Sequence, residues 1–203
     1  MHTVDAITLL LFFTLLIISI IAHEVAHGYA AYSLGDPTAY YEGRLTLNPV
    51  SHFDFIGSLI VPMISYFTAG FIFGWAKPVP YNPYNLRHGR AGEALVAAAG
   101  PMTNVAIALL FGLVYNFAGA ALPATFLSAI SLLVTLNVTL AVVNLLPIPT
   151  LDGGKILFSI LPYRFAYLER SLEPYGIFVL LGVVLFGWSI LGGIIVKLSE
   201  LLI

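Results

Sequence analysis

Long uncharged apolar segments dominate this chain. Ala6–Ala22 holds 17 residues without a charge or a histidine, and Pro174–Val196 is a further uncharged segment of 23 residues. Ala94–Leu151 is uncharged over 58 residues, which at 1.5 Å per residue is far too long for one crossing of a hydrocarbon core ~30 Å thick. Glycine and proline at 119–123 divide it into two helices. The pattern therefore predicts about four full transmembrane helices.

Two segments between these helices have a different pattern. Phe55–Ala76 is also uncharged, but glycines and a proline interrupt it, with Pro62 or Gly70 as the expected bend. We predict a re-entrant or broken apolar segment there. The stretch "YYEGRLTL" is rich in β-forming residues and lies between turn residues, which predicts a small β-hairpin-like element.

The predicted fold class is an all-α polytopic membrane protein, built as a single intramembrane domain over residues 1–203. The N-terminal apolar segment lacks the basic region of a signal peptide, so we interpret it as a retained helix. The expected parts are helix one at 4–33, a β-like and re-entrant region at 36–90, helices at 92–118 and 124–147, an LDGG loop with an interfacial helix at 148–172, and a last helix at 174–198.

Composition agrees with a membrane protein and narrows the chemistry. The chain is 60% hydrophobic and 9% charged, with a mean hydropathy of +0.97, whereas soluble domains contain about 25% charged residues. The lipid bilayer is therefore a partner, and a net charge of −2 indicates no basic surface for nucleic acid. Cysteine is absent, which leaves His, Asp and Glu as strong metal ligands. Nothing in the composition indicates an oligomeric state.

The sequence "HEVAH", directly after the first apolar segment, carries the candidate chemistry. On a helix, His23 and His27 lie on one face and can bind one metal ion. Glu24 lies beside that ion, where it can take a proton from an activated water. About 0.004 such matches are expected by chance at this composition. The alternative is a hydrogen-bonded histidine pair inside a bundle, but three ionisable groups within five residues are costly at membrane depth.

A catalytic zinc site usually has three protein ligands, so a third ligand is expected elsewhere in the chain. The best candidate is Asp152, which follows the long apolar segment in "NLLPIPTLDGG". Gly153 and Gly154 allow the chain to turn there. Spacing alone leaves two interpretations of Asp152 equally open, a metal ligand or a helix-capping carboxylate.

Three motifs together resemble the signatures of the site-2 protease family of intramembrane zinc metalloproteases. They are "HEVAH", "AAAGPMTN" at 97–104 and "NLLPIPTLDGG" at 144–154, in the order and rough spacing of that family. The resemblance implies that His23, His27 and Asp152 bind one Zn²⁺ per chain and that Glu24 is the catalytic base. It also indicates a short form, because 203 residues leave no room for the PDZ domain inserted in some relatives.

Other polar residues have weaker functional interpretations. Asn144 could hydrogen-bond the substrate backbone or a developing oxyanion, as the family pattern hints, or it could form an interhelical hydrogen bond. Gly100 is interpreted as a site of close helix packing. His52 and Asp54 could support the metal site, although placement at the membrane interface is the simpler interpretation.

The predicted function is hydrolysis of peptide bonds within or near transmembrane segments of membrane-anchored protein substrates. The alternative is a membrane metal transporter or metal-binding scaffold, because intramembrane His and carboxylate residues also line ion pathways. A transporter usually has ligands on several helices with access from both faces, whereas this cluster lies at one end of one helix.

Basic residues predict the orientation in the membrane. With the N-terminus outside, only Lys197 lies on the outer side. Seven basic residues then lie in cytoplasmic connections: Arg44, Lys77, Arg87, Arg90, Lys155, Arg164 and Arg170. We therefore expect a multi-pass protein of a prokaryotic plasma membrane with its active site near the cytoplasmic face. Phe55–Ala76 must then make no net crossing, because a third crossing would put Asp152 roughly 30 Å from the histidines.

Overall fold

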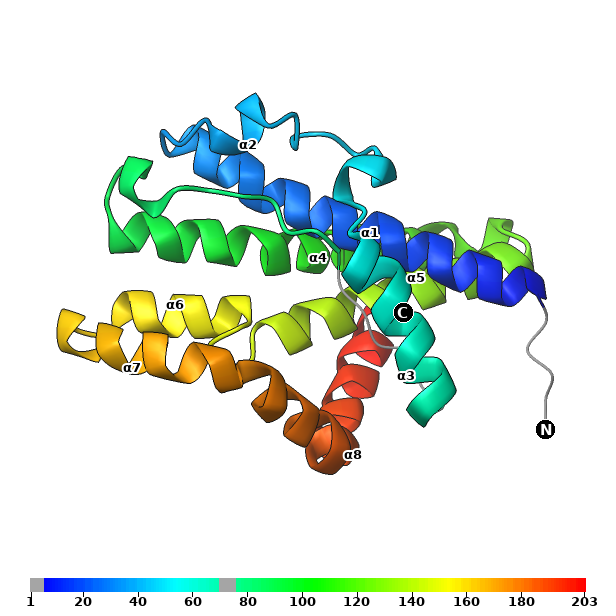
Figure 1. Ribbon diagram of the computed structural model, residues 1–203. Coiled ribbons are helices and arrows are strands. Elements are labelled where there is room, and N and C mark those ends of the chain that lie inside the picture. The colour runs from blue at the N-terminus through cyan, green and yellow to red at the C-terminus, as the bar shows by residue number, and fades with distance from the viewer. Residues whose placement is uncertain (1–5, 70–75) are drawn as a thin grey trace.

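Four long helices form the body of the protein (Figure 1). The computed structural model describes residues 6–69 and 76–203. The long helices are α1 (Ala6–Ser33), α4 (Arg90–Ala118), α5 (Ala124–Asn144) and α8 (Gly176–Leu202). Each lies in a candidate membrane span by length and composition, so the prediction of four apolar helices in an all-helical membrane protein is confirmed. Residues 4 and 5 of the predicted helix one lie outside the described part.

Short helical elements connect the long helices. α2 and α3 lie between α1 and α4, while α6 and α7 connect α5 to α8. Their bounds are Thr38–Tyr41 for α2, Val61–Ala69 for α3, Asp152–Ile160 for α6 and Ala166–Leu172 for α7. A π-helical turn covers Ile56–Ile60, and 3-10 turns cover Pro49–His52, Pro83–Asn85, Gly119–Ala121, Tyr163–Phe165 and Glu173–Tyr175.

The predicted β-hairpin-like element is wrong. Within 6–69 and 76–203 the structure contains no strand. The tyrosines of "YYEGRLTL" end the short helix α2, and a tight turn follows, in which Gly43 has φ of +64°. The Arg44 backbone N–H donates to the Ala39 carbonyl at 2.9 Å, so local turn bonds use groups that a hairpin ladder would need.

The structure describes only part of the predicted re-entrant segment. Residues 56–69 form the π turn and α3, an apolar stretch shorter than the four candidate spans. Residues 70–75, including the proposed bend at Gly70, lie outside the described residues. The absence of a net crossing by Phe55–Ala76 therefore stays a prediction.

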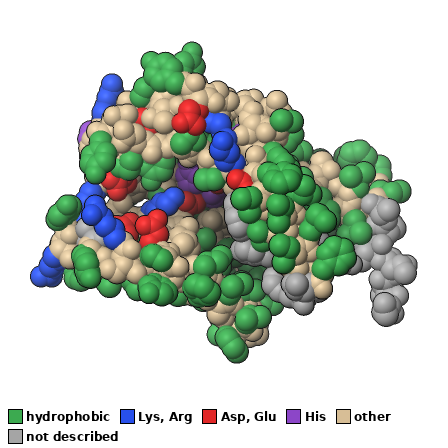
Figure 2. Space-filling view, in the orientation of Figure 1, with side chains coloured by type: hydrophobic (Ala, Val, Ile, Leu, Met, Phe, Trp, Pro, Cys, Tyr) green, Lys and Arg blue, Asp and Glu red, His purple; other side chains and the backbone are tan. Residues whose placement is uncertain are grey.

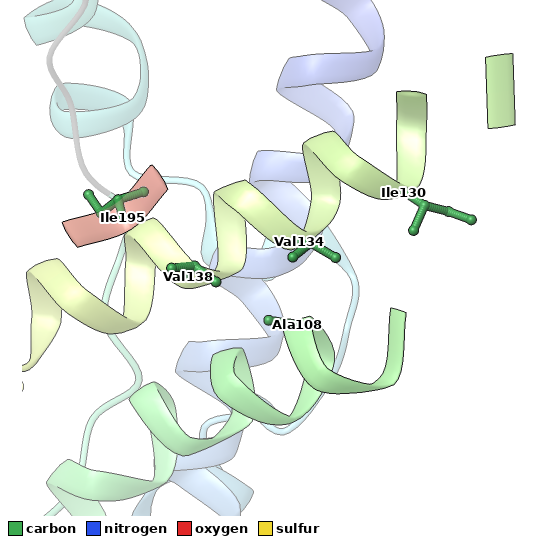
Figure 3. Close-up of a cluster of buried hydrophobic side chains, with 5 residues drawn as sticks. All are labelled: Ala108, Ile130, Val134, Val138 and Ile195. Carbon is green, nitrogen blue, oxygen red and sulfur yellow. The ribbon is translucent and has the colours of Figure 1, made fainter. Parts of the chain in front are cut away.

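Helix α4 packs against α1, α5 and α6, and these contacts bring distant parts of the sequence together. Figure 1 shows α4 lying between α1 and α6. A cluster of buried apolar side chains joins α4, α5 and α8 away from the polar centre of the molecule (Figure 3). Its buried members are Ala108, Ile130, Val134, Val138 and Ile195. The outer faces of the long helices remain apolar and exposed, as lipid contact requires.

A buried carboxylate anchors the segment that precedes α4. Asp36, just after α1, accepts hydrogen bonds from Thr38 Oγ1 at 2.6 Å, Asn82 N at 2.7 Å and Asn85 Nδ2 at 2.8 Å, and a longer one from Thr38 N at 3.3 Å. The segment 77–82, here called the strap, runs extended between α1 and α4 (Figure 1). Asp36 therefore ties the end of the strap to the end of α1.

Candidate metal centre

Three side chains from two helices converge on one point. His23 and His27 lie one turn apart on α1, and Asp152 is the first residue of α6. Asp152 Oδ2 lies 3.0 Å from His23 Nε2 and 3.3 Å from His27 Nε2, and the two Nε2 atoms are 3.1 Å apart. All three residues are buried. They form the one group of three potential metal-ligating side chains found among the described residues.

Hydrogen bonds at the far side of each imidazole fix where its proton lies. His27 Nδ1 is 2.7 Å from the Val96 carbonyl oxygen, which can only accept, so Nδ1 carries the proton and donates. His23 Nδ1 lies 2.6 Å from Asn104 Oδ1, which accepts in the same way. Zinc binds the neutral form of imidazole, and with the proton on Nδ1 that form has its Nε2 lone pair free and directed at the other ligands.

A chain of amides keeps the Asn104 oxygen facing His23. Asn104 Nδ2 donates to Asn137 Oδ1 at 2.9 Å, and Asn137 Nδ2 donates to Ser19 Oγ at 2.9 Å. Asn104, Asn137 and Ser19 are all buried and come from α4, α5 and α1. Because the Asn104 amide nitrogen is used in this chain, its oxygen is the atom left for the imidazole. Three helices thus set the tautomer and orientation of His23.

The convergent atoms fit a bound zinc ion. Ligands ~2.0–2.1 Å from a tetrahedral centre lie about 3.3 Å apart, close to the observed separations of 3.0 to 3.3 Å. Asp152 Oδ2 is buried without a hydrogen-bond donor, and its nearest polar neighbours are the two Nε2 atoms, which carry no proton in the metal-binding form of the rings. Three lone-pair atoms this close repel one another unless a cation lies between them. Two imidazole nitrogens and one carboxylate oxygen are a ligand set typical of zinc.

Three glycines permit this close approach. A Cβ atom on Gly100 of α4 would collide with both imidazole rings. A Cβ on Gly153 would collide with the backbone of Leu145, and one on Gly154 with the Ile148 carbonyl. The glycines of the LDGG sequence therefore let the preceding loop pack closely against α6, and this packing positions Asp152. Neither Gly153 nor Gly154 has a left-handed backbone conformation.

Glu24 lies beside the cluster in a cavity of about 160 Å³. Asn144, Tyr81 and Lys155 also line this cavity. Figure 2 shows histidine surface inside a hollow, with acidic and basic side chains around its mouth. Glu24 Oε2 accepts a hydrogen bond from the Val79 backbone N–H at 2.9 Å. Burial, together with nearby acidic groups, raises the pKa of Tyr81 to about 12, so its phenol stays protonated at neutral pH.

The other predicted residues fall in different places. Asn144 lines the cavity, and its Nδ2 donates to the Leu140 carbonyl at 2.9 Å within α5. His52 is buried but bonds the Thr46 carbonyl, and Asp54 accepts from the Gly57 backbone N–H at the start of the π turn. In the described part of the chain these side chains hydrogen-bond locally, and neither His52 nor Asp54 hydrogen-bonds the metal-ligand cluster.

Sequence reasoning missed the role of Asn104 and underestimated that of Gly100. Asn104 is the last residue of "AAAGPMTN" and one of four asparagines in an uncharged segment of 58 residues. Polar residues in such segments usually face a partner inside the bundle, and this was the available signal. The hydrogen bond from Val79 to Glu24 could not be predicted from the sequence, because every residue except proline has a backbone N–H.

The fold and the site define a class of protein, a helical membrane protein with the ligand set of a zinc metallopeptidase. The profile of peptidase family M50 matches residues 114–187. A Bacillus subtilis protein named "Putative zinc metalloprotease YwhC" is 39% identical over 173 residues, covering 82% of this chain and 76% of that protein. The chain therefore belongs to peptidase family M50, the site-2 protease family of zinc metalloproteases.

Mycobacterial relatives are also similar. Two proteins named "Putative zinc metalloprotease Rip2" are 35% identical over 159 residues in Mycolicibacterium smegmatis and 30% identical over 158 residues in Mycobacterium tuberculosis. Each alignment covers 78% of this chain but 59% of the relative, so the chain spans about three fifths of the Rip2 length. No solved structure gave a significant match.

Proposed function

We propose that this protein is an intramembrane protease that hydrolyses peptide bonds within or near the transmembrane segments of membrane-anchored proteins. One observation carries the proposal. Two imidazole nitrogens with fixed tautomers and a carboxylate oxygen without a donor converge within a group of long apolar helices, and Glu24 lines the same cavity. This combination supports a hydrolytic site that acts on membrane-spanning substrates.

In this proposal His23, His27 and Asp152 hold one zinc ion per chain. When bound, zinc would polarise the scissile carbonyl and acidify water at neutral pH. Val96 and Asn104, which accept hydrogen bonds from the Nδ1–H groups, hold each imidazole with its Nε2 atom directed at the metal position.

Glu24 is the proposed general base. Its carboxylate takes a proton as the water oxygen bonds to the carbonyl carbon, and it returns this proton to the nitrogen as the C–N bond breaks. Glu24 therefore ends the reaction in the same protonation state in which it began. Asn144, which lines the same cavity, is proposed to hydrogen-bond the substrate backbone through its Oδ1, because its Nδ2 is used within α5.

The proposed location is a prokaryotic plasma membrane, with the site near the cytoplasmic face. The seven-to-one distribution of basic residues supports this orientation. The bacterial origin of the relatives supports a prokaryotic membrane.

Reconstituted protein tests this function. Liposomes that contain the protein and a single-span reporter should release a cleaved fragment, whereas Glu24→Gln should retain zinc and lose at least 100-fold in turnover. Glu200→Gln, an exposed glutamate on α8, is the matched control and should cleave as the wild type does. Wild-type turnover by Glu24→Gln would refute the proposed base, and zinc flux without cleavage would favour the transporter alternative.

A further inference from the structure

We propose that the strap, residues 77–82, is a positioning element for the catalytic base, with Val79 and Arg44 as its key residues. The Val79 backbone N–H donates to Glu24 Oε2 at 2.9 Å, and the Arg44 guanidinium holds the strap in the place that this contact requires. The inference rests on the proposed role of Glu24 and adds residues that the H-E-x-x-H sequence does not contain.

The strap is fixed on both sides of Val79. Arg44 Nη2 donates to the Lys77 carbonyl at 2.8 Å and to the Pro78 carbonyl at 3.2 Å. The Lys77 N–H donates to the His52 carbonyl at 2.9 Å, and further along, the Asn82 N–H is bound by Asp36. Arg44 is buried, although it is a long charged side chain, and in the described part of the chain both hydrogen bonds of its guanidinium go to the strap. Its burial is therefore best explained by this attachment.

Val79 itself is held against α1. Its side chain is buried, and a Cβ atom on Gly28 would lie 2.8 Å from Val79 Cγ1, so the glycine after His27 makes room for the strap. Prolines flank Val79 on both sides. Proline has no N–H and restricts the residue before it to extended conformations, so 78–80 is a stiff segment with a single N–H, that of Val79.

This contact orients the carboxylate of Glu24. Because Oε2 accepts the Val79 N–H, we infer that Oε1, which has no hydrogen bond to the described residues, receives the proton from water. A general base must lie within hydrogen-bond reach of the proton it takes, and small displacements of catalytic groups can lower rates by about 100-fold. The strap thus restricts rotation of the carboxylate, and among the described residues it makes no hydrogen bond to the proposed ligands of the metal.

Two substitutions at one position separate the N–H from the side chain. Val79→Pro removes the N–H and replaces the γ-methyl groups by a ring, and Val79→Ala keeps the N–H while removing both buried γ-methyl groups. In liposomes with the single-span reporter, Val79→Pro should lower kcat at least 10-fold with KM within about 2-fold of wild type. Val79→Ala should keep kcat within about 2-fold of wild type. Both variants should retain the wild-type zinc content.

An equal loss of kcat in both variants would overturn the inference, because the side chain rather than the N–H would then matter. Unchanged kcat in Val79→Pro, or loss of its zinc, would also overturn it. Arg44→Met provides an independent variant that leaves Val79 intact. It should lower kcat at full zinc content, and a wild-type kcat would contradict the role of the guanidinium. Failure of this inference can be told apart from failure of the proposed function. The proposed role of Glu24 fails only if Glu24→Gln is active.

Discussion

Asn104 offers a sharp test of how the protein builds its metal site. Its side chain is fully buried on α4, with Oδ1 2.6 Å from His23 Nδ1 and Nδ2 2.9 Å from Asn137 Oδ1. Asn104→Ala removes the acceptor that keeps the His23 proton on Nδ1. The ring can then rotate or place its proton on Nε2, and in either case the lone pair that zinc requires is no longer held in place.

The size of the effect follows from these contacts. Loss of a hydrogen-bond partner behind a metal-ligating histidine typically lowers metal affinity 10- to 100-fold, which is about 1.4–2.8 kcal/mol. The free energy of unfolding should change less, by about 1–2 kcal/mol. Asn137 limits this loss, because its Nδ2 still donates to Ser19 Oγ and to the Leu133 carbonyl. Zinc affinity should therefore report the substitution more strongly than stability does.

Chelator competition in detergent at fixed pH measures the zinc affinity directly. Asn116→Ala is a matched control, because Asn116 lies on the same helix and donates to the Gly112 and Leu202 carbonyls far from the site. The control should bind zinc as tightly as wild type. If Asn104→Ala also did so, or if both variants lost affinity equally, the argument that Asn104 fixes the His23 tautomer would be refuted.

Three further predictions follow from other parts of the structure. Gly100→Ala places a methyl group against both imidazoles, so zinc content and turnover should fall together while a Glu24→Gln protein keeps its zinc. Burial alone would raise the pKa of Asp36, but the hydrogen bonds that its carboxylate accepts have the larger total effect, so the pKa in the folded protein is lowered. These hydrogen bonds therefore stabilise the fold at pH values above the ordinary pKa of aspartate, and this stabilisation is lost as the pH falls through the lowered pKa. Thermal unfolding of Asp36→Asn should show lower stability than wild type at pH 7 and a smaller loss on acidification. Single cysteines at positions 51 and 82 should both be labelled from the cytoplasmic side, and labelling from opposite faces would contradict the absence of a net crossing between them.

The sequence predicted the long helices because the membrane imposes a strong pattern. Uncharged segments of about 20 residues have few alternatives to a spanning helix. The four long helices α1, α4, α5 and α8 could therefore be predicted from hydropathy alone. The stretch "YYEGRLTL" shows where this reasoning ends. Its β-forming residues lie outside the spans, where local turn bonds and the attachment of Arg44 to the strap decide the conformation.

Proximity of the proposed ligands was predictable only in part. His23 and His27 share a helix face by spacing, which the sequence displays directly. Asp152 is 125 residues beyond His27, and spacing alone left its role open until the motif resemblance was considered. The imidazoles are held by the Val96 backbone carbonyl and by the Asn104 side chain. A sequence pattern shows neither which backbone carbonyl lies near a histidine nor which tautomer the ring adopts.

Apart from Ser199 on α8, the buried polar side chains of the long helices in the described part of the chain gather at this one site. Ser19, Asn137 and Asn104 form a continuous hydrogen-bonded chain that ends on His23, while His27 is held by α4. Each such group is costly in a hydrocarbon environment unless it has a partner. A chain of partners spread over three helices makes the orientation of His23 depend on the packing of the whole helical group. Helix packing and metal binding are therefore coupled here, and substitutions that shift α5 against α4 should weaken zinc binding even where they touch no ligand.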